Sequence, residues 1–302
     1  MSRVHDALRR AENFGTPQPP AATLPALGSM ISQQTQASVA EPNVLQGLLE
    51  QIKEIPWDPN PEAHIIDHTK ASDAPAEEFR SLRTRLNHVQ GLQQLRSLVV
   101  TSASPAEGKS FTAANLAVVQ SHLQGNLTLL CDFDFRRPIA HNLFQIDRSP
   151  GITEYLQGKA ALSEVIRRVQ GTNLFVLPAG ETVANPLELL NLPEVKVLLT
   201  RLPQLFKWII IDSPPLLFAA DANLLSTLCD GTLLVVRLGA TTIDSVTRAL
   251  QSMSRNNVLG VVANGAKRGE LYSKYTYYHS YYYEDDDKVK DAAPNDEEEE
   301  ES

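Results

Sequence analysis

The chain contains little cysteine, no long apolar run and no excess of positive charge. Its two cysteines, among 302 residues, do not make a disulfide framework or a metal cluster. No stretch approaches the roughly 18 consecutive apolar residues of a transmembrane helix, and the first residues lack the apolar core of a signal peptide. The formal net charge of −9 argues against non-specific nucleic-acid binding. These absences predict a cytoplasmic protein that does not bind nucleic acid.

The negative charge and the tyrosines both gather near the C-terminus. Residues 284–302 hold eleven carboxylates and two lysines, which account for the whole net charge of −9. Just before them, residues 272–283 hold seven of the eight tyrosines of the chain. A stretch as acidic as 284–302 is expected to be disordered. We therefore predict a separate tail over residues 271–302.

Residues 1–62 are predicted to form an N-terminal region of short helices and linker. Apolar side chains recur at helical spacing in residues 2–14 and again in residues 43–55. Pro56 ends the second of these segments. Between them, residues 15–41 are rich in Pro, Ala, Gln, Ser and Thr, a composition typical of a linker.

Residues 63–270 show the pattern of a compact domain in which short apolar runs alternate with helical segments. The runs expected to form strands are 98–100, 127–131, 174–177, 208–211, 233–236 and 258–263. The expected helices include 75–91, 110–122, 193–202, 219–228 and 242–255. Such alternation implies right-handed crossovers and a parallel sheet that is covered on both faces. The predicted class is α/β, a mainly parallel sheet flanked by helices, with ligands at the carboxyl ends of the strands.

The first apolar run leads directly into a phosphate-loop pattern. The segment 103–110 reads Ala-Ser-Pro-Ala-Glu-Gly-Lys-Ser, and a helix is expected to open at Lys109. Backbone N–H groups and the helix dipole at such a position favour phosphate oxygens. Lys109 would reach the β- and γ-phosphates of ATP, and the Ser110 hydroxyl would bind Mg²⁺. Ala103 stands where the usual pattern has glycine, which weakens the match because alanine tolerates a positive φ less well.

Carboxylates follow two further strands at the same edge of the predicted sheet. Asp132 and Asp134 come directly after the second apolar run, and two arginines follow them. One interpretation is structural, with these carboxylates capping a helix near Pro138. The functional interpretation places Asp132 near the metal and the acceptor, with Asp134 supporting it. Asp212 ends the fourth run, and an apolar strand that ends in Asp beside a phosphate loop is the usual second anchor for a metal.

These three segments together resemble the Walker A, A′ and B motifs of bacterial tyrosine kinases (BY-kinases), the kinases of polysaccharide synthesis and export. The segments are 103–110, 129–138 and 209–215, and the resemblance covers about residues 75–283. It implies a P-loop NTPase fold with bound ATP and Mg²⁺. The cofactor-binding residues that it implies are Ala106, Glu107, Gly108, Lys109, Ser110, Phe111 and Asn264. Metal binding would fall to Ser110, Asp132 and Asp212, and catalysis to Lys109, Asp132, Asp134 and Asp212.

The resemblance also implies how such a kinase works in the cell. It identifies the tyrosine cluster as the phosphoacceptor: Tyr272, Tyr275, Tyr277, Tyr278, Tyr281, Tyr282 and Tyr283. The family motif Glu-x-x-Arg-x-x-Arg, present here as Glu77, Arg80 and Arg83, implies a ring-shaped homo-oligomer in which one subunit offers its tail to its neighbour. A membrane-spanning polysaccharide co-polymerase would act as activator and hold the protein at the inner face of the membrane. A phosphotyrosine phosphatase is the implied opposing partner.

Two other functions remain open from the residues alone. One is a hydrolytic P-loop ATPase that partitions chromosomes or places the division site. That class carries a second lysine early in the phosphate loop, where this chain has Ser104, and lacks a tyrosine tail. The other is a nucleotide-dependent scaffold that times polysaccharide assembly, with phosphorylation weak or lost, because the same residues would bind ATP.

Overall fold

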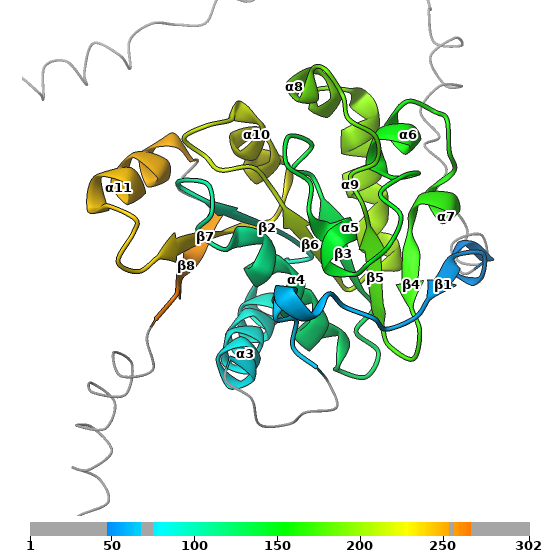
Figure 1. Cartoon of the computed structure of the whole chain (residues 1–302), viewed down its shortest axis with the longest axis horizontal. Helices are drawn as coiled ribbons and strands as arrows, with labels where there is room; N and C mark the ends of the chain where they lie inside the picture. Colours follow the sequence, from blue (N-terminus) through cyan, green and yellow to red (C-terminus); the bar gives the residue numbers. More distant parts are fainter. Residues whose placement is uncertain (1–46, 68–74, 254–256, 267–302) are drawn as a thin grey trace, which may run out of the picture. The chain divides into compact units, whose positions relative to one another are not determined.

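A mostly parallel sheet forms the centre of the computed structural model, which describes residues 47–67, 75–253 and 257–266. Its strands are β1 (Lys53–Ile55), β2 (Ser97–Ser102), β3 (Thr128–Asp132), β4 (Arg167–Val169), β5 (Leu174–Leu177), β6 (Trp208–Asp212), β7 (Gly231–Arg237) and β8 (Val258–Asn264). In space their order is β1-β4-β5-β3-β6-β2-β7-β8 (Figure 1). Only the pairing of β4 with β5 is antiparallel among these strands.

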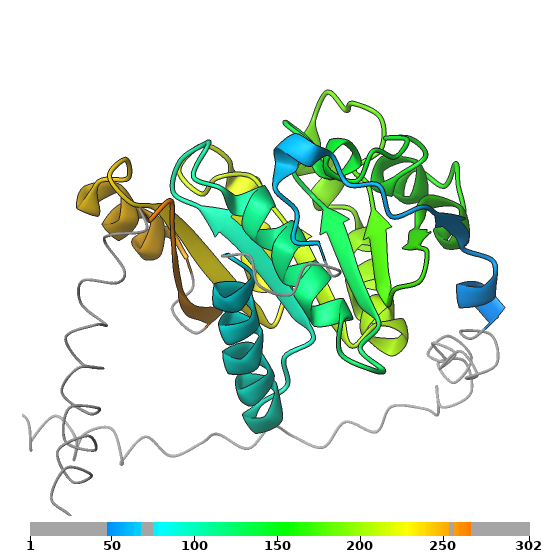
Figure 2. The same cartoon turned by 60° about the horizontal axis from the view of Figure 1, so that its bottom comes forward.

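Helices cover both faces of this sheet. They are α3 (Ala76–Leu92), α4 (Lys109–Ser121), α5 (Ala140–Leu143), α6 (Ile152–Leu156), α7 (Leu162–Val165), α8 (Pro186–Leu190), α9 (Pro193–Leu205), α10 (Ala220–Leu228) and α11 (Ile243–Ser252), with a short 3-10 turn at Pro61–Ala63. In Figure 2, α3 and α4 lie along the near face. None of the helices in the described residues combines the length and apolar composition that crossing a bilayer requires.

Alternate residues of the central strands feed two separate cores. Val99, Leu129 and Ile211 belong to the core on the side of α9 and α10. Their neighbours Val100 and Leu130 belong to the core on the side of α3 and α4. Because both faces are buried, these strands are apolar throughout. The predicted α/β class and the mainly parallel sheet are therefore confirmed.

The helix predicted over residues 43–55 is wrong at its C-terminal end. Residues 47–50 are helical, but Lys53–Ile55 forms the edge strand β1, which pairs with β4. Ile52 is buried in one core and Ile55 in the other. The two apolar residues are therefore three positions apart, a spacing that is also typical of one face of a helix. The sheet thus begins ahead of the expected boundary at residue 63.

The segment between β1 and α3 is attached to the domain by specific contacts. The Asn60 N–H donates to the Leu143 carbonyl at 2.9 Å, and the Ile66 N–H donates to the buried Asn115 Oδ1 at 2.7 Å. Figure 2 shows this segment, in blue, crossing from the sheet edge toward α4. The predictions for residues 2–14, 15–41 and the whole tail 271–302 lie outside the described residues.

Candidate active site

The phosphate loop connects β2 to α4 at the carboxyl edge of the sheet. Gly108 precedes the first turn of α4 with φ +94°, and Ala106 also has a positive φ, +62°. Ala103 does not adopt a positive φ. The difficulty expected for alanine in place of glycine at residue 103 therefore does not arise, and it is Ala106 that adopts the left-handed conformation.

The buried Glu107 side chain braces the loop from inside. Its Oε2 accepts a hydrogen bond from the Ala103 N–H at 3.0 Å, and its Oε1 accepts one from the Thr241 hydroxyl at 2.5 Å. Thr241 lies in the connection between β7 and α11. The Glu107 carboxylate therefore links the two ends of the phosphate loop to each other and to this connection. This bracing role was not foreseen from the sequence, where Glu107 was expected only to line the nucleotide.

Two more side chains hold the loop from the β7–β8 side. Arg237 donates to the Ala106 carbonyl at 3.1 Å, and the Asn264 amide donates to the Glu107 carbonyl at 3.0 Å. The Asn264 amide also occupies the space beside Gly108, where a Cβ would lie only 2.0 Å from its nitrogen. Asn264 thus contacts the phosphate loop itself, and its contact with the nucleotide stays a prediction. Arg237 and Thr241 belong to no motif that could have identified them from the sequence.

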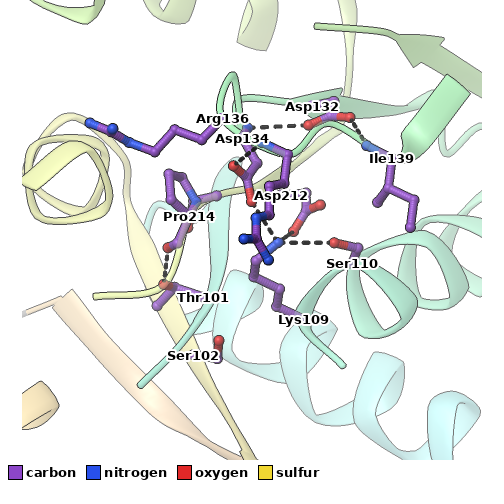
Figure 3. A network of polar contacts seen from close by, with 12 residues as sticks. Thr101, Ser102, Lys109, Ser110, Asp132, Asp134, Arg136, Ile139, Asp212 and Pro214 are labelled. Carbon is purple, nitrogen blue, oxygen red and sulfur yellow. Dashed lines mark hydrogen bonds and ion pairs between the residues drawn. The ribbon is translucent and has the colours of Figure 1, made fainter. Parts of the chain in front are cut away.

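Lys109 reaches from the start of α4 into a group of buried carboxylates. Its Nζ lies 2.8 Å from Asp134 Oδ2, 3.7 Å from Asp212 Oδ1 and 3.1 Å from Ser110 Oγ. Figure 3 shows these side chains converging from α4 and from the ends of β3 and β6. The strand order places β3 beside β6 and β6 beside β2, so the three motifs meet at one edge as predicted.

Asp132 is held by backbone donors. Its Oδ2 accepts from the Ile139 and Ala140 N–H groups, each at 2.9 Å, and its Oδ1 accepts from the Asp134 N–H at 3.2 Å. The first two hydrogen bonds satisfy N–H groups at the amino end of α5. The structural interpretation, in which these carboxylates cap a helix near Pro138, therefore describes a contact that Asp132 makes. It does not replace the functional one, because a carboxylate offers about four acceptor positions and Oδ1 retains capacity.

The proton affinities of this group follow from burial and crowding. Burial, together with the charge of Asp212, raises the pKa of Asp132 to about 7. Burial also raises the pKa of Asp212, although Lys109 opposes it. Burial lowers the pKa of Lys109, but Asp212 and Asp134 outweigh this, and the pKa lies above its ordinary value. Lys109 is therefore a fixed cation, whereas Asp132 is poised to take a proton near neutral pH.

The residues present fit a magnesium ion that arrives with a nucleotide. Both oxygens of Asp212 are buried without a hydrogen-bond partner, and the Ser110 hydroxyl lies in the same cluster. Within the described residues, no group of three or more His, Cys, Asp or Glu side chains is placed to hold a metal by itself. Mg²⁺ commonly takes only one or two protein ligands and completes its shell with phosphates and water. Asp212 and Ser110 suit that arrangement better than Asp132, whose oxygens already accept three N–H groups.

A second ion pair joins the loop after β3 to α10. Arg136 forms a bidentate contact with the buried Asp221, at 2.9 Å and 3.3 Å. Asp221 was missed in the sequence, where it is merely an acidic residue near the start of a helix. The neighbouring Arg137 contributes its backbone N–H to Asp134 at 3.0 Å. Both arginines thus take part in holding the carboxylate-bearing loop.

The remaining predicted residues lie on α3 and α4. Glu77 and Arg80 form an ion pair with each other on α3, and Glu77 is exposed. Arg83 instead donates to the Val119 carbonyl of α4 at 2.8 Å. Phe111 packs edge-on against Phe79, with ring centroids 5.8 Å apart, so its ring serves the contact between these helices. The seven predicted acceptor tyrosines lie outside the described residues.

The chain resembles known proteins over most of its length. It is 34% identical over 217 residues to the tyrosine-protein kinase YwqD of Bacillus subtilis, which covers 71% of this chain and 91% of YwqD. The chain belongs to the bacterial tyrosine-protein kinases. It is also 30% identical to the putative tyrosine-protein kinase CapB of Staphylococcus aureus over 213 residues, 93% of that protein. It spans only 27% of the longer kinase Etk of Escherichia coli, at 32% identity. No family model matches the chain.

Solved structures of this kinase family share the fold. The chimeric protein CapA2B2 superposes with a TM-score of 0.64 at 27% identity, over 76% of this chain and all of that one. The kinase domain of Escherichia coli Etk superposes with a TM-score of 0.61 at 28% identity, over 76% of this chain and 96% of that one. The resemblance inferred from the motifs is confirmed, and with it the P-loop NTPase fold.

Proposed function

We propose that this kinase uses ATP to phosphorylate the tyrosines of its own tail, in trans between subunits of an oligomer. The observation that carries the proposal is the Lys109 ammonium, held within 2.8 Å of Asp134 at the edge where the phosphate loop and Asp132 also lie. A cation at this position suits the γ-phosphate, and a carboxylate with a pKa of about 7 suits a phenolic proton. The tyrosine cluster 272–283 supplies the acceptors.

In the proposed reaction, the tyrosine oxygen attacks the γ-phosphorus of ATP. The bond to the β-phosphate oxygen breaks, its electron pair stays with ADP, and the phenolic proton passes to Asp132. Tyrosine has a pKa near 10, so it arrives protonated and a nearby carboxylate serves as a late acceptor. Lys109 and the loop N–H groups counter the charge on the transferring group. Mg²⁺, held by Ser110 and Asp212, would add further charge neutralisation when bound with ATP.

Incubation of the purified chain with labelled ATP tests this reaction. Phosphotyrosine should form on the tail and should be absent from Lys109→Ala. A hydrolytic ATPase would release phosphate without phosphotyrosine, and a scaffold would bind nucleotide and do neither. Formation of phosphotyrosine by Lys109→Ala at the wild-type rate would contradict the assignment of the site.

The proposed oligomer uses the α3 surface. Glu77 is exposed on α3 and forms an ion pair with Arg80, whereas Arg83 donates to the Val119 carbonyl of α4. We expect Glu77→Ala with Arg80→Ala to reduce the particle mass measured by light scattering. Arg83→Ala would remove a contact between helices as well, so it serves as a separate variant. Unchanged mass for the double variant over a range of concentrations would contradict this interface.

The cellular setting follows from the family resemblance. We propose that the kinase regulates exopolysaccharide or capsule synthesis, that a membrane-spanning co-polymerase activates it at the inner face of the membrane, and that a phosphotyrosine phosphatase reverses the modification. Membrane fractions prepared with and without the co-polymerase test this arrangement. The kinase should sediment with the membrane only when that protein is present.

A further inference from the structure

The two ends of the sheet differ in how their outer strands are protected. At one end, β1 has only three residues, and its Lys53 and Glu54 are exposed. Pro56 follows directly, and proline has no N–H to donate to a further strand. Short length, charged side chains and proline all keep an edge strand from pairing with another chain. This end of the sheet is therefore poorly suited to further pairing.

The strand at the other end, β8, lacks these devices. It has seven residues, Val-Leu-Gly-Val-Val-Ala-Asn, and none of them is charged or proline. Among the described residues β8 pairs only with β7, so its other edge has no strand beside it there (Figure 1). Val261 leaves 54% of its surface exposed. An uncharged edge strand of this length is a template for a further strand.

The backbone groups of Val261 and Ala263 point toward the free edge. The Asn264 carbonyl accepts from the N–H of Leu238, the residue directly after β7, at 2.9 Å, so Asn264 faces β7. Along a strand, the N–H and C=O groups of successive residues alternate between the two edges. The register of β8 against β7 is regular from Gly260 to Asn264. Val261 and Ala263 thus offer donors and acceptors to a further strand.

The side chain of Val261 lies on the face of the sheet that α11 covers. Val261 is in register with Leu234 of β7, and Leu234 packs in one cluster with Ala249 of α11. Residues in register on parallel neighbours point to the same face. Ile243, at the start of α11, is 86% exposed. The helix therefore covers Leu234 but leaves Val261 and its own first residue open to solvent.

We propose that β8 pairs antiparallel with β8 of a second copy of this chain, so that the two sheets join into one. Val261 then lies opposite Val261 of the second copy at the two-fold axis, and Ala263 lies opposite Leu259 of the second copy. In this register the two Val261 residues exchange both of their backbone hydrogen bonds. The same surface serves on both chains, as an isologous dimer requires.

The two-fold axis accounts for the incomplete cover of Val261. The axis runs perpendicular to the joined sheet, so the α11 helices of both copies lie on the same face, one on each side of the valine pair. The two Val261 side chains then cover each other between these helices. Burial of this apolar surface favours association. No charge on the paired strands leaves water, because β8 carries none.

The chain that follows β8 suits this edge less well than a second copy does. It could pair with β8 only by turning back directly after Asn264. The residues 267–270, Lys-Arg-Gly-Glu, would then lie opposite β8. Glycine and charged residues are depleted in strands, and charges at an edge oppose pairing. A second copy instead brings an uncharged strand that is already formed, which lowers the entropy cost of association.

This pairing goes beyond the proposed function and is separate from phosphorylation in trans. In an antiparallel pair, the carboxyl end of one β8 lies beside the amino end of the other. The chain that leaves Asn264 therefore begins at the amino edge of the partner's sheet, whereas the phosphate loop lies at the carboxyl edge. The pair would join oligomers built through α3 without delivering acceptor tyrosines.

Particle mass tests the pairing in the full-length chain. The parent protein for this test carries Glu77→Ala with Arg80→Ala, which removes the proposed α3 contact. It also carries Tyr→Phe at all seven tail tyrosines, which removes their phosphorylation. Light scattering over a range of concentrations then measures the remaining association alone. The parent should approach twice the mass of one chain as its concentration rises.

A lysine at the two-fold axis should break the dimer. We expect Val261→Lys to raise the dissociation constant at least tenfold, because two ammonium groups would meet at the centre of the paired strands. Val197→Lys is the matched control, since Val197 is a valine on α9 that is 46% exposed. It should leave the mass unchanged. Each variant should keep the parent's melting temperature and its binding of a fluorescent ATP analogue, which excludes a loss of fold.

Cross-linking tests the register. Cα atoms lie about 5.5 Å apart in a hydrogen-bonded antiparallel pair, and a disulfide spans roughly 4.4–6.8 Å between Cα atoms. Val261→Cys should therefore form a covalent dimer with oxidised glutathione. Ala263→Cys should not, because the two copies of residue 263 lie four positions out of register, about 13 Å apart. The natural Cys131 and Cys229 are buried and should not contribute.

Three results would overturn the proposal. The first is a parent protein that remains a single chain at every concentration, which would leave the β8 edge to another segment or another protein. The second is an equal effect of Val261→Lys and Val197→Lys on the mass. The third is a covalent dimer from Ala263→Cys with none from Val261→Cys. Neither assay measures phosphotyrosine, so these outcomes do not depend on the proposed function.

Discussion

Replacing Asp212 by Asn should stabilise the protein without nucleotide. Both oxygens of Asp212 are buried without a hydrogen-bond partner, and Asp134 adds like charge nearby. Lys109 and Ser110 lower the pKa of Asp212 again, but less than burial and Asp134 together raise it. Because the folded-state pKa is raised, ionisation of Asp212 reduces stability as pH rises through the range from its unfolded to its folded pKa. The uncharged amide of the Asp212→Asn variant would remove that cost.

The size of the effect follows from the local geometry. Asparagine also leaves polar atoms buried at this place, so the gain comes only from removing the cost of ionising a buried carboxyl, which is about 1.4 kcal/mol for each unit by which its pKa is raised. That cost already includes the attraction between Asp212 and Lys109 at 3.7 Å. Lys109 keeps its closer partner Asp134 at 2.8 Å, so we expect a net gain of about 1 kcal/mol at pH 8. For a domain of this size the melting temperature should rise by roughly 2–4 °C.

Thermal unfolding with and without Mg·ATP provides the test. At pH 8 without ligand, Asp212→Asn should melt above the wild type, and the difference should shrink toward pH 4, where the wild-type carboxylate is protonated as well. With Mg·ATP the wild type should gain more than the variant, because Asp212 is the proposed metal anchor. Asp134→Asn is the control and should melt lower, since Asp134 satisfies both Lys109 and the Arg137 N–H. A lower melting point for Asp212→Asn without ligand would refute the reasoning.

Further predictions concern the phosphate loop and the thiols. Gly108→Ala should weaken binding of a fluorescent ATP analogue, because the φ of +94° at Gly108 strains any residue with a Cβ, and the new Cβ, 2.0 Å from the Asn264 amide nitrogen, would displace that side chain from the loop. Ala106→Gly should raise the free energy of unfolding in urea by about 1 kcal/mol, because it relieves the left-handed alanine. Burial raises the pKa of the Cys131 thiol well above its ordinary value and that of the Cys229 thiol to about 12. Neither should react with a thiol reagent at pH 8 until the protein is unfolded.

The central strands could be predicted from the sequence, because each is a short apolar run that ends at a polar or charged residue. β5 forms over the predicted residues 174–177, and β6 extends the predicted run by one residue to include Asp212. Strands buried on both faces are apolar throughout and short, which separates them from the longer helices. The strands β1 and β4, which are neighbours at one end of the sheet, have only three residues each. A segment this short has too few residues for an apolar pattern to identify it as a strand.

The site was predictable to the extent that its residues belong to local motifs. Lys109, Ser110, Asp132, Asp134 and Asp212 all lie at strand or helix ends, and a parallel sheet must bring such ends to one edge. The contacts that hold the site together join residues far apart in sequence. Thr241 meets Glu107 across 134 residues, and Asp221 meets Arg136 across 85. No local pattern encodes such pairs, because each depends on the completed packing.

Asn264 determines where the chain can safely be shortened. It ends β8, and its amide fills the space beside Gly108 while it binds the Glu107 carbonyl. Tyr272 follows only eight residues later. A truncation that removes residue 264 together with the proposed acceptor tyrosines would also open the phosphate loop, and the loss of activity would then have two causes. A variant that lacks the proposed acceptor tyrosines should therefore retain Gly265 as its last residue, or keep its full length with phenylalanine at each tail tyrosine.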